Sequence, residues 1–385
     1  MANFNDISAL LESFCQKGPP GCACALARDG NIIHESYHGL ANVEDGIPMT
    51  EDTVFRLFSM TKLLVCGAAL IQFERGKFLL NEPLYEYFPE YRSHRLVKIQ
   101  PNGGIVIEEA KNPMLIKHAF SMAVGLPHSF EESPTACAMR EAKEKLGPGK
   151  YTLRQEIAAV AEAPIAFEPG THFLYGYGHD LAAGLVEATS GKSIGAFLKE
   201  EIFDPLEMNS TGYRFWGNLK ERMTPVYQRN KDGSVHRNPV DFDAFYQPDA
   251  IYEGGGTGIF STVRDYLSFT QMLANGGEYR GRRIIGRKTI DLMRRNQLNE
   301  VQLRDFANSY NAGYGYGLGV RTMMDPAAGN SNSSVGEFGW TGAAGTWTSI
   351  DPSEGFSAVY MHQTMPNMEE YHHLRFRAAA YGCLN

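Results

Sequence analysis

The chain has 385 residues, a formal net charge of −8 at pH 7, 43% hydrophobic residues and 21% charged residues. These proportions are typical of a soluble globular protein, and the length allows more than one compact domain. The charge is dispersed and no block of five basic residues occurs, so a nucleic-acid partner is not expected. No apolar stretch approaches the ~18 residues of a transmembrane helix, so no membrane partner is expected either.

The N-terminal residues and the cysteines both indicate a cytoplasmic protein. Residues 1–6 lack the basic and apolar segments of a signal peptide. The cysteines are too widely spaced for a disulfide-stabilised domain, so reduced thiols are expected. They are Cys15, Cys22, Cys24, Cys66, Cys137 and Cys383. Nothing in the sequence indicates a cofactor, and the oligomeric state stays open.

The N-terminal part of the chain predicts a helix, a hairpin and a buried helix. An amphipathic helix is expected to start at Asp6, with Asp6 as its cap. Strands at residues 22–27 and 31–37 follow, joined by an Asp-Gly turn. Residues 59–75 are apolar on nearly all sides of a helix, which is typical of a helix buried in the core.

The middle of the chain predicts mostly helices and loops, and its last third predicts strands. A hairpin is expected at residues 97–107 and a polar, lid-like segment at 127–150. Residues 214–252 form a loop-like region rich in aromatic side chains, which either cover the core or line an apolar pocket. Further helices are predicted at 180–188, 194–202, 263–273 and 369–381, and further strands at 314–323, 336–340, 345–350 and 356–361.

Strands at both ends of the chain, with helices between them, predict an α+β fold. We expect an antiparallel β-sheet flanked by the N-terminal and C-terminal helices, with a mostly helical domain inserted into the chain. Residues 1–80 and 254–385 are assigned to the sheet domain, and residues 81–253 to the inserted domain.

Two short motifs match enzyme signatures but lie in the wrong structural context. His34 and His38 match the zinc-protease signature His-Glu-x-x-His, which needs a helix to bring both imidazoles to one metal. In the predicted strand they would lie roughly 13 Å apart, so no metal site is expected. Residues 191–195 match the nucleophile elbow Gly-x-Ser-x-Gly, which needs a strand before the serine. A helix precedes Ser193 instead, so we expect Ser193 to cap the next helix.

A third match, Ser59-Met60-Thr61-Lys62, is the Ser-x-x-Lys arrangement of penicillin-recognising enzymes. A serine hydroxyl becomes a nucleophile only when a neighbouring base takes its proton. At the start of a helix, positions i and i+3 share a face, so the amine of Lys62 can reach Ser59. The positive end of the helix also favours a developing oxyanion. Because the residues around Lys62 are apolar, a solvated surface lysine is not the natural interpretation.

The sequence resembles one enzyme superfamily over nearly its whole length, because three motifs occur in the order and at the intervals typical of that superfamily. Residues 53–62 resemble the nucleophile region of class C β-lactamases, in the superfamily of serine β-lactamases and penicillin-binding proteins. Residues 173–180 look like the second motif, with Tyr175 at its tyrosine, and residues 339–343 occupy the place of the Lys-Thr-Gly strand. Within the superfamily, the sequence is most similar to family VIII carboxylesterases and the lovastatin-type acyltransferase.

The resemblance implies roles for individual residues. Ser59 would attack the acyl carbonyl, and Lys62 and Tyr175 would together relay protons; which of the two is the formal base stays open, because coupled groups titrate as a pair. The backbone N–H groups of Ser59 and Ala343 would form the oxyanion hole. The residues implied in substrate binding are Trp340, Thr341, Gly342 and Tyr177.

The sequence departs from the β-lactamase pattern at three places. Trp340 stands where β-lactamases usually carry a cation that attracts the substrate carboxylate, and an indole cannot supply that charge. Tyr177 replaces an asparagine that contacts the amide side chain of the substrate. Residues 122–126 are apolar where many relatives have His-Thr-Ser-Gly-Leu, and this change has no functional explanation.

We therefore predict a serine hydrolase that cleaves neutral carboxylic esters with short or medium acyl chains through an acyl-enzyme on Ser59. Acyl transfer to an alcohol or amine shares the first half-reaction and is the main alternative. Weak hydrolysis of β-lactams or D-Ala-D-Ala peptides, a ligand-binding relative without activity, and an esterase that uses Ser193 are the others.

Overall fold

The centre of the computed structural model, which describes residues 4–147 and 150–384, is an eight-stranded sheet. Its strand order is β12-β13-β14-β15-β16-β1-β2-β3, and neighbouring strands are antiparallel. The N-terminal strands are β1 (Gly21–Arg28), β2 (Asn31–Asn42) and β3 (Ile47–Pro48). The C-terminal strands are β12 (Tyr314–Tyr316), β13 (Arg321–Met323), β14 (Phe338–Gly339), β15 (Trp347–Asp351) and β16 (Phe356–Met361). Both ends of the chain thus build one sheet, and the predicted α+β fold with an antiparallel sheet is confirmed.

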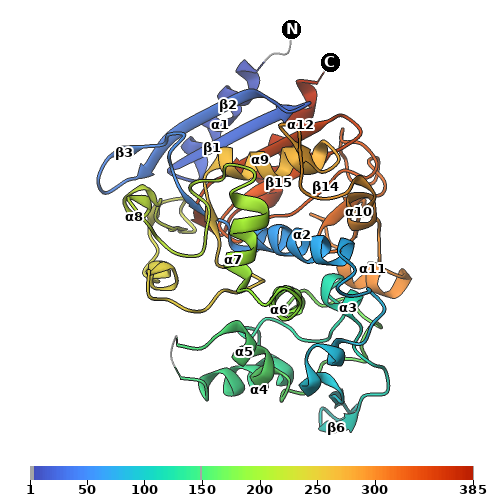
Figure 1. Ribbon diagram of the computed structural model, residues 1–385. Coiled ribbons are helices and arrows are strands. Elements are labelled where there is room, and N and C mark those ends of the chain that lie inside the picture. The colour runs from blue at the N-terminus through green and yellow to red at the C-terminus, as the bar shows by residue number, and fades with distance from the viewer. Residues whose placement is uncertain (1–3, 148–149, 385) are drawn as a thin grey trace.

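Helices cover both faces of this sheet, because side chains alternate along a strand and β1 is apolar on both sides. The covering helices are α1 (Asn5–Lys17), α12 (Glu369–Gly382), α2 (Thr61–Glu74) and α9 (Val263–Ala274). Cys22 and Cys24 pack with α1 and α12, whereas Ala23 and Ala25 belong to the large core that contains α2 and α9. In Figure 1 both termini lie at the same end of the molecule, beside α1 and α12.

The segment that leads into α2 carries the Ser-x-x-Lys motif. Strand β4 (Phe55–Arg56) is followed by a short 3-10 turn, Phe58–Met60, and then by α2. Phe58 has a φ of +46°, a left-handed conformation that a non-glycine residue adopts only under constraint from its surroundings. The residues from Thr61 to Gln72 are all buried, which confirms the predicted core helix. Gly76, with a φ of +67°, stops the helix.

The middle of the chain contributes short helices and three small sheets. The helices are α3 (Ile116–Phe120), α4 (Pro134–Glu144), α5 (Leu153–Val160), α6 (Gly178–Ser190), α7 (Ile194–Leu198) and α8 (Leu219–Arg222). The first small sheet is the predicted hairpin of β5 (Arg95–Ile99) and β6 (Ile105–Glu109). In the second, β7 (Tyr227–Arg229) lies between β8 (Val235–Arg237) and β17 (Thr364–Met365). In the third, β9 (Phe260–Ser261) pairs with β4. In Figure 1, α4, α5 and β6 lie at the end of the molecule opposite the termini. The division at residues 80 and 254 stays a prediction.

Between α9 and β12 the chain forms the hairpin β10 (Glu278–Tyr279) and β11 (Arg282–Arg283), and the helices α10 (Arg287–Met293) and α11 (Glu300–Phe306). Within the described part of the chain, no helix is both long enough and apolar enough to cross a membrane.

Three local expectations are corrected by the structure. The first helix begins at Asn5, so Asp6 lies in its first turn and does not cap it. The stretch 314–323 forms two strands, because Gly317 closes a turn by donating a backbone hydrogen bond to Val320. The stretch 194–202 is α7 followed by a π-helical turn, Lys199–Phe203. The lid-like segment 127–150 contains α4, and its residues 148 and 149 lie outside the described residues.

Candidate active site

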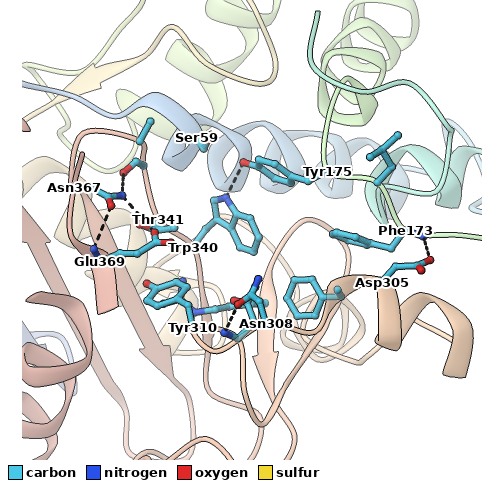
Figure 2. A pocket seen from close by; sticks show the side chains of 16 residues that line it. Ser59, Phe173, Tyr175, Asp305, Asn308, Tyr310, Trp340, Thr341, Asn367 and Glu369 are labelled. Carbon is cyan, nitrogen blue, oxygen red and sulfur yellow. Dashed lines mark hydrogen bonds between the residues drawn. The ribbon is translucent and has the colours of Figure 1, made fainter. Parts of the chain in front are cut away.

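Ser59 lies at the edge of a cavity of about 430 Å³ between the start of α2 and the C-terminal strands (Figure 2). Of the predicted residues, the structure brings Ser59, Tyr175, Trp340, Thr341 and Ala343 to this cavity, together with Gly342. The other lining residues are Phe173, Leu174, Asp305, Phe306, Asn308, Tyr310, Asn311, Arg321, Asn367 and Glu369. Segments separated by more than a hundred residues therefore meet at one serine.

Lys62 is buried, with 1% of its surface exposed, and its amine faces Ser59. The Nζ atom donates hydrogen bonds to Ser59 Oγ at 3.2 Å and to the carbonyl oxygen of Gly256 at 2.7 Å. It also lies 4.7 Å from the centre of the Tyr175 ring. Of the two predicted proton-relay residues, Lys62 is thus the one hydrogen-bonded to the serine, as the i, i+3 spacing predicts.

Tyr175 contributes its ring face to Lys62 and its hydroxyl group to Trp340. The indole Nε1 of Trp340 donates a hydrogen bond to Tyr175 Oη at 3.0 Å, drawn as a dashed line in Figure 2. The two rings pack with centroids 5.3 Å apart. Trp340 therefore supplies an uncharged N–H donor at the position where β-lactamases usually carry a cation, in addition to the apolar wall expected from the sequence.

The turn between β14 and β15 holds Ala343 beside Ser59. Thr346 Oγ1 donates to the carbonyl oxygen of Leu57 at 3.0 Å, which ties the turn to the residue two positions before Ser59. A Cβ atom on Gly342 would lie 2.3 Å from that same oxygen, so only glycine allows this approach. Ser59 and Ala343, whose backbone N–H groups are the predicted oxyanion donors, thus line one cavity.

The end of the cavity away from Lys62 is polar, a property that the sequence did not reveal. Arg321 is 2% exposed and donates to the carbonyl oxygen of Thr348 at 3.2 Å. Tyr310 Oη lies 3.0 Å from His373 Nδ1, and burial raises the pKa of Glu369. These residues come from β13, α12 and the loop before β12, and no motif spacing connects them to Ser59.

Two histidines near Lys62 are held neutral. Burial, followed by the charge of Lys62, lowers the pKa of His128 and of His179 to about 3 in each case. The ring of His128 contacts Tyr175 edge-on, with centroids 5.2 Å apart, and His179 Nε2 lies 3.1 Å from the carbonyl oxygen of Phe120. At neutral pH both imidazole rings near Lys62 are therefore uncharged.

Tyr177 is the one predicted substrate-binding residue that does not line the cavity. It is 4% exposed, belongs to the main hydrophobic core, and has Lys143 Nζ 5.1 Å from its ring centre. An aromatic ring at a position where relatives carry asparagine gains more from burial than from contact with solvent. Tyr177 accordingly packs in the core, and its assignment to substrate binding stays a prediction.

The two rejected motifs have structural explanations. Ser193 Oγ accepts a hydrogen bond from the backbone N–H of Ala196 at 3.2 Å, so Ser193 caps α7 as predicted. His34 and His38 lie on β2, where His34 stacks on Phe4 and His38 Nε2 lies 2.6 Å from Ser36 Oγ. The described residues contain no group of three His, Cys, Asp or Glu side chains that could hold a metal ion.

Fold and cavity together define a serine hydrolase of the penicillin-recognising type. The chain belongs to the beta-lactamase family, whose sequence profile matches residues 5–382. Among curated relatives, esterase EstB of Burkholderia gladioli is 26% identical over 89% of this chain and 86% of its own length.

Solved structures show the same fold. Simvastatin synthase (LovD) from Aspergillus terreus superposes with a TM-score of 0.82 at 22% identity, covering 99% of this chain and 98% of LovD. EstCE1, described as a hydrolase with promiscuous acyltransferase activity, gives a TM-score of 0.81 at 21% identity and covers 98% of both chains.

Proposed function

We propose that the protein hydrolyses neutral carboxylic esters with short or medium acyl chains through an acyl-enzyme on Ser59. The observation that carries this proposal is the hydrogen bond from Trp340 Nε1 to Tyr175 Oη at 3.0 Å. It gives the tyrosine a donor without placing a cation where a β-lactam carboxylate would bind. The likeness to esterase EstB supports the same reaction class.

In the proposed reaction, Lys62 in its amine form takes the proton of Ser59 while Oγ bonds to the acyl carbon. The backbone N–H groups of Ser59 and Ala343 stabilise the oxyanion of the tetrahedral intermediate. The carbon–oxygen bond to the alcohol then breaks, and the alcohol oxygen receives the hydroxyl proton of Tyr175. Lys62 passes the proton that it took from Ser59 to Tyr175. Water attacks the resulting ester of Ser59 by the reverse transfers, releasing the carboxylic acid and restoring the serine.

The lining of the cavity supports a neutral substrate. The residues that line it include one basic side chain, Arg321, and two acidic ones, Asp305 and Glu369, so the lining offers no excess of positive charge to an anionic ligand. Part of the wall is aromatic, formed by Tyr175 and Trp340 and, beside Asp305, by Phe173, which favours apolar acyl or alcohol groups.

The test compares p-nitrophenyl acetate, butyrate and octanoate with nitrocefin and with a D-Ala-D-Ala peptide. We expect kcat/KM to be highest for acetate or butyrate and lower for the β-lactam and the peptide. Faster turnover of nitrocefin or of the peptide than of every ester would contradict the proposal.

Acyl transfer to an alcohol or amine is the second candidate, because the cavity beside Ser59 has room for an acceptor molecule. EstCE1, which has the same fold, is described as a hydrolase with promiscuous acyltransferase activity. Product analysis after adding a primary alcohol to the p-nitrophenyl butyrate reaction distinguishes the two: a transferase gives mainly the new ester, and a hydrolase gives mainly butyrate.

A further inference from the structure

We propose that Asp180 is a positioning residue for Lys62, acting through the backbone of Gly255 and Gly256. This inference rests on the proposed function, since it concerns the base that activates Ser59. Asp180 lies in the first turn of α6, is 7% exposed, and comes from a segment more than a hundred residues after Lys62.

A chain of hydrogen bonds joins Asp180 to the nucleophile. Asp180 Oδ1 accepts hydrogen bonds from the backbone N–H of Gly255 at 2.9 Å and of Gly256 at 3.1 Å. The carbonyl oxygen of Gly256 accepts from Lys62 Nζ at 2.7 Å, and Lys62 Nζ donates to Ser59 Oγ at 3.2 Å. The carboxylate thus fixes the peptide whose oxygen orients the amine toward the serine.

The two glycines are required by the space between α6 and α2. A Cβ atom on Gly255 would lie 2.0 Å from the carbonyl oxygen of His179, which no side chain permits. A Cβ atom on Gly256 would lie 2.9 Å from Asp180 Oδ2 and 3.4 Å from Lys62 Nζ. Asp180 and Lys62 therefore lie on either side of the Gly256 Cα atom, and a side chain at this position would enter the space between them.

The charges around Asp180 come from three helices. Lys62 lies on α2, Lys143 on α4 and Glu156 on α5. Asp180 also acts on the hydroxyl groups of four tyrosines, which are Tyr252, Tyr213, Tyr177 and Tyr91. Lys143 Nζ pairs with Glu156 Oε1 at 2.8 Å, and Tyr252 Oη donates to the same oxygen at 3.1 Å. Lys143 is thus already paired with Glu156, and Lys62 is a second cation close to Asp180, across Gly256.

These charges also affect the pKa of the buried Asp180 carboxyl group. Burial and then Glu156 raise the pKa of Asp180, while Lys143, Lys62 and the N–H of Gly256 oppose that rise. An asparagine at this position keeps a side-chain oxygen for the two glycines but removes the negative charge. Asp180→Asn therefore removes a negative charge that faces Lys62 across Gly256 and keeps an acceptor for the two glycine N–H groups.

The experiment measures how fast a fluorophosphonate labels Ser59 as a function of pH, together with kcat/KM for p-nitrophenyl butyrate. Labelling needs an activated serine but no natural substrate, so it remains informative if ester hydrolysis is not the function. For Asp180→Asn we expect labelling to slow about tenfold or more at the optimum and the acidic limb of the profile to move down by about one pH unit.

Asp265→Asn is the matched control. Asp265 also lies in the first turn of a helix, α9, and accepts hydrogen bonds from the backbone N–H of Ser210 at 2.7 Å and from Thr211 Oγ1 at 3.0 Å. Burial raises its pKa as it does for Asp180. We expect its substitution to lower the melting temperature without moving the acidic limb.

An acidic limb that stays in place in Asp180→Asn, or that moves equally in Asp265→Asn, would overturn the proposal. If Asp180→Asn does not fold, Gly256→Ala decides the matter, because its methyl group enters the space between Asp180 and Lys62 while both charges remain. We expect slower labelling of Ser59 in a folded Gly256→Ala protein, and an unchanged labelling rate would equally overturn the proposal.

Discussion

Ser59 and Ser193 share three features. Each lies at the start of a helix, each matches an enzyme signature, and each lines a cavity, of about 430 Å³ for Ser59 and about 490 Å³ for Ser193. Their hydroxyl oxygens even make hydrogen bonds of equal length, 3.2 Å, with Lys62 Nζ for Ser59 and with the backbone N–H of Ala196 for Ser193.

The difference lies in what surrounds each hydroxyl. The charged side chains that line the Ser193 cavity form ion pairs with each other, Arg214 with Glu253 and Lys199 with Asp204. Lys62, in contrast, is buried and directs its amine at Ser59 and a carbonyl oxygen. A cavity and a helix start therefore do not make a nucleophile; a buried base aimed at the hydroxyl does.

The largest effect on kcat/KM is expected for a substitution of Lys62, and Lys199 in the Ser193 cavity is the residue compared with it. Lys62→Met removes the base, so we expect kcat/KM for p-nitrophenyl butyrate to fall by at least about 100-fold. Lys199→Met, in the Ser193 cavity, changes an exposed residue and should leave kcat/KM within about twofold. A Lys62→Met enzyme as active as Lys199→Met would remove the distinction between the two sites.

Acid is expected to destabilise the Ser59 region through His128, whereas no histidine is among the residues that line the Ser193 cavity. Because the folded-state pKa of His128 is about 3, below the ordinary value of 6.5, the unfolded chain binds the proton first as pH falls. The stability contributed by neutral His128 is complete above about pH 6.5 and is lost progressively toward pH 3. At pH 5 this loss is about 2 kcal/mol.

His128→Phe keeps an aromatic ring against Tyr175 but cannot bind the proton. Urea unfolding at pH 7.5 and pH 5 should therefore show a smaller acid-induced loss of stability for His128→Phe than for the wild type. Equal losses in both proteins would show that His128 is protonated in the folded state at pH 5.

Each of the two cavities is lined by a tryptophan, which allows a finer comparison. Trp340→Phe keeps the wall of the Ser59 cavity but removes the hydrogen bond to Tyr175, which is worth about 1 kcal/mol. We expect kcat to fall about fivefold with little change in KM. Trp216→Phe, in the Ser193 cavity, should leave both constants unchanged. A rise in KM alone for Trp340→Phe would mean that the indole serves only to bind substrate.

The smallest effect concerns Ser193 itself. Ser193→Ala removes the cap of α7 and should lower the free energy of unfolding by about 1 kcal/mol, while kcat/KM stays at the wild-type value. Ser193→Asp restores a capping oxygen and should recover the stability, as measured by urea unfolding. Loss of ester hydrolysis in Ser193→Ala at unchanged stability would assign a chemical role to this serine.

Local patterns in the sequence predicted the parts of the site that lie on single elements. The spacing of Ser59 and Lys62 needs only one helical turn, and the cap at Ser193 needs only its own helix. The hairpin of β1 and β2 followed from an Asp-Gly turn between apolar runs, and both turn residues have positive φ, 50° at Asp29 and 82° at Gly30.

The rest of the site depends on contacts between distant segments, which no local pattern encodes. Gly256 is 194 residues from Lys62, and Arg321 reaches the cavity only because β13 pairs with β14. Tyr177 is predicted to bind substrate because it stands where the resemblance places a substrate-contacting asparagine, whereas the turn into α6 directs its ring to the core. The direction of a side chain depends on packing, which a motif position does not encode.

The most direct measurement is the identity of the serine that becomes covalently modified. The wild-type protein is treated with a p-nitrophenyl alkylphosphonate, digested, and analysed by mass spectrometry. We predict one phosphonate per chain, on the peptide that contains Ser59, and no labelling of Ser59→Ala. A phosphonate on Ser193, or undiminished labelling of Ser59→Ala, would contradict the assignment of Ser59 as the nucleophile.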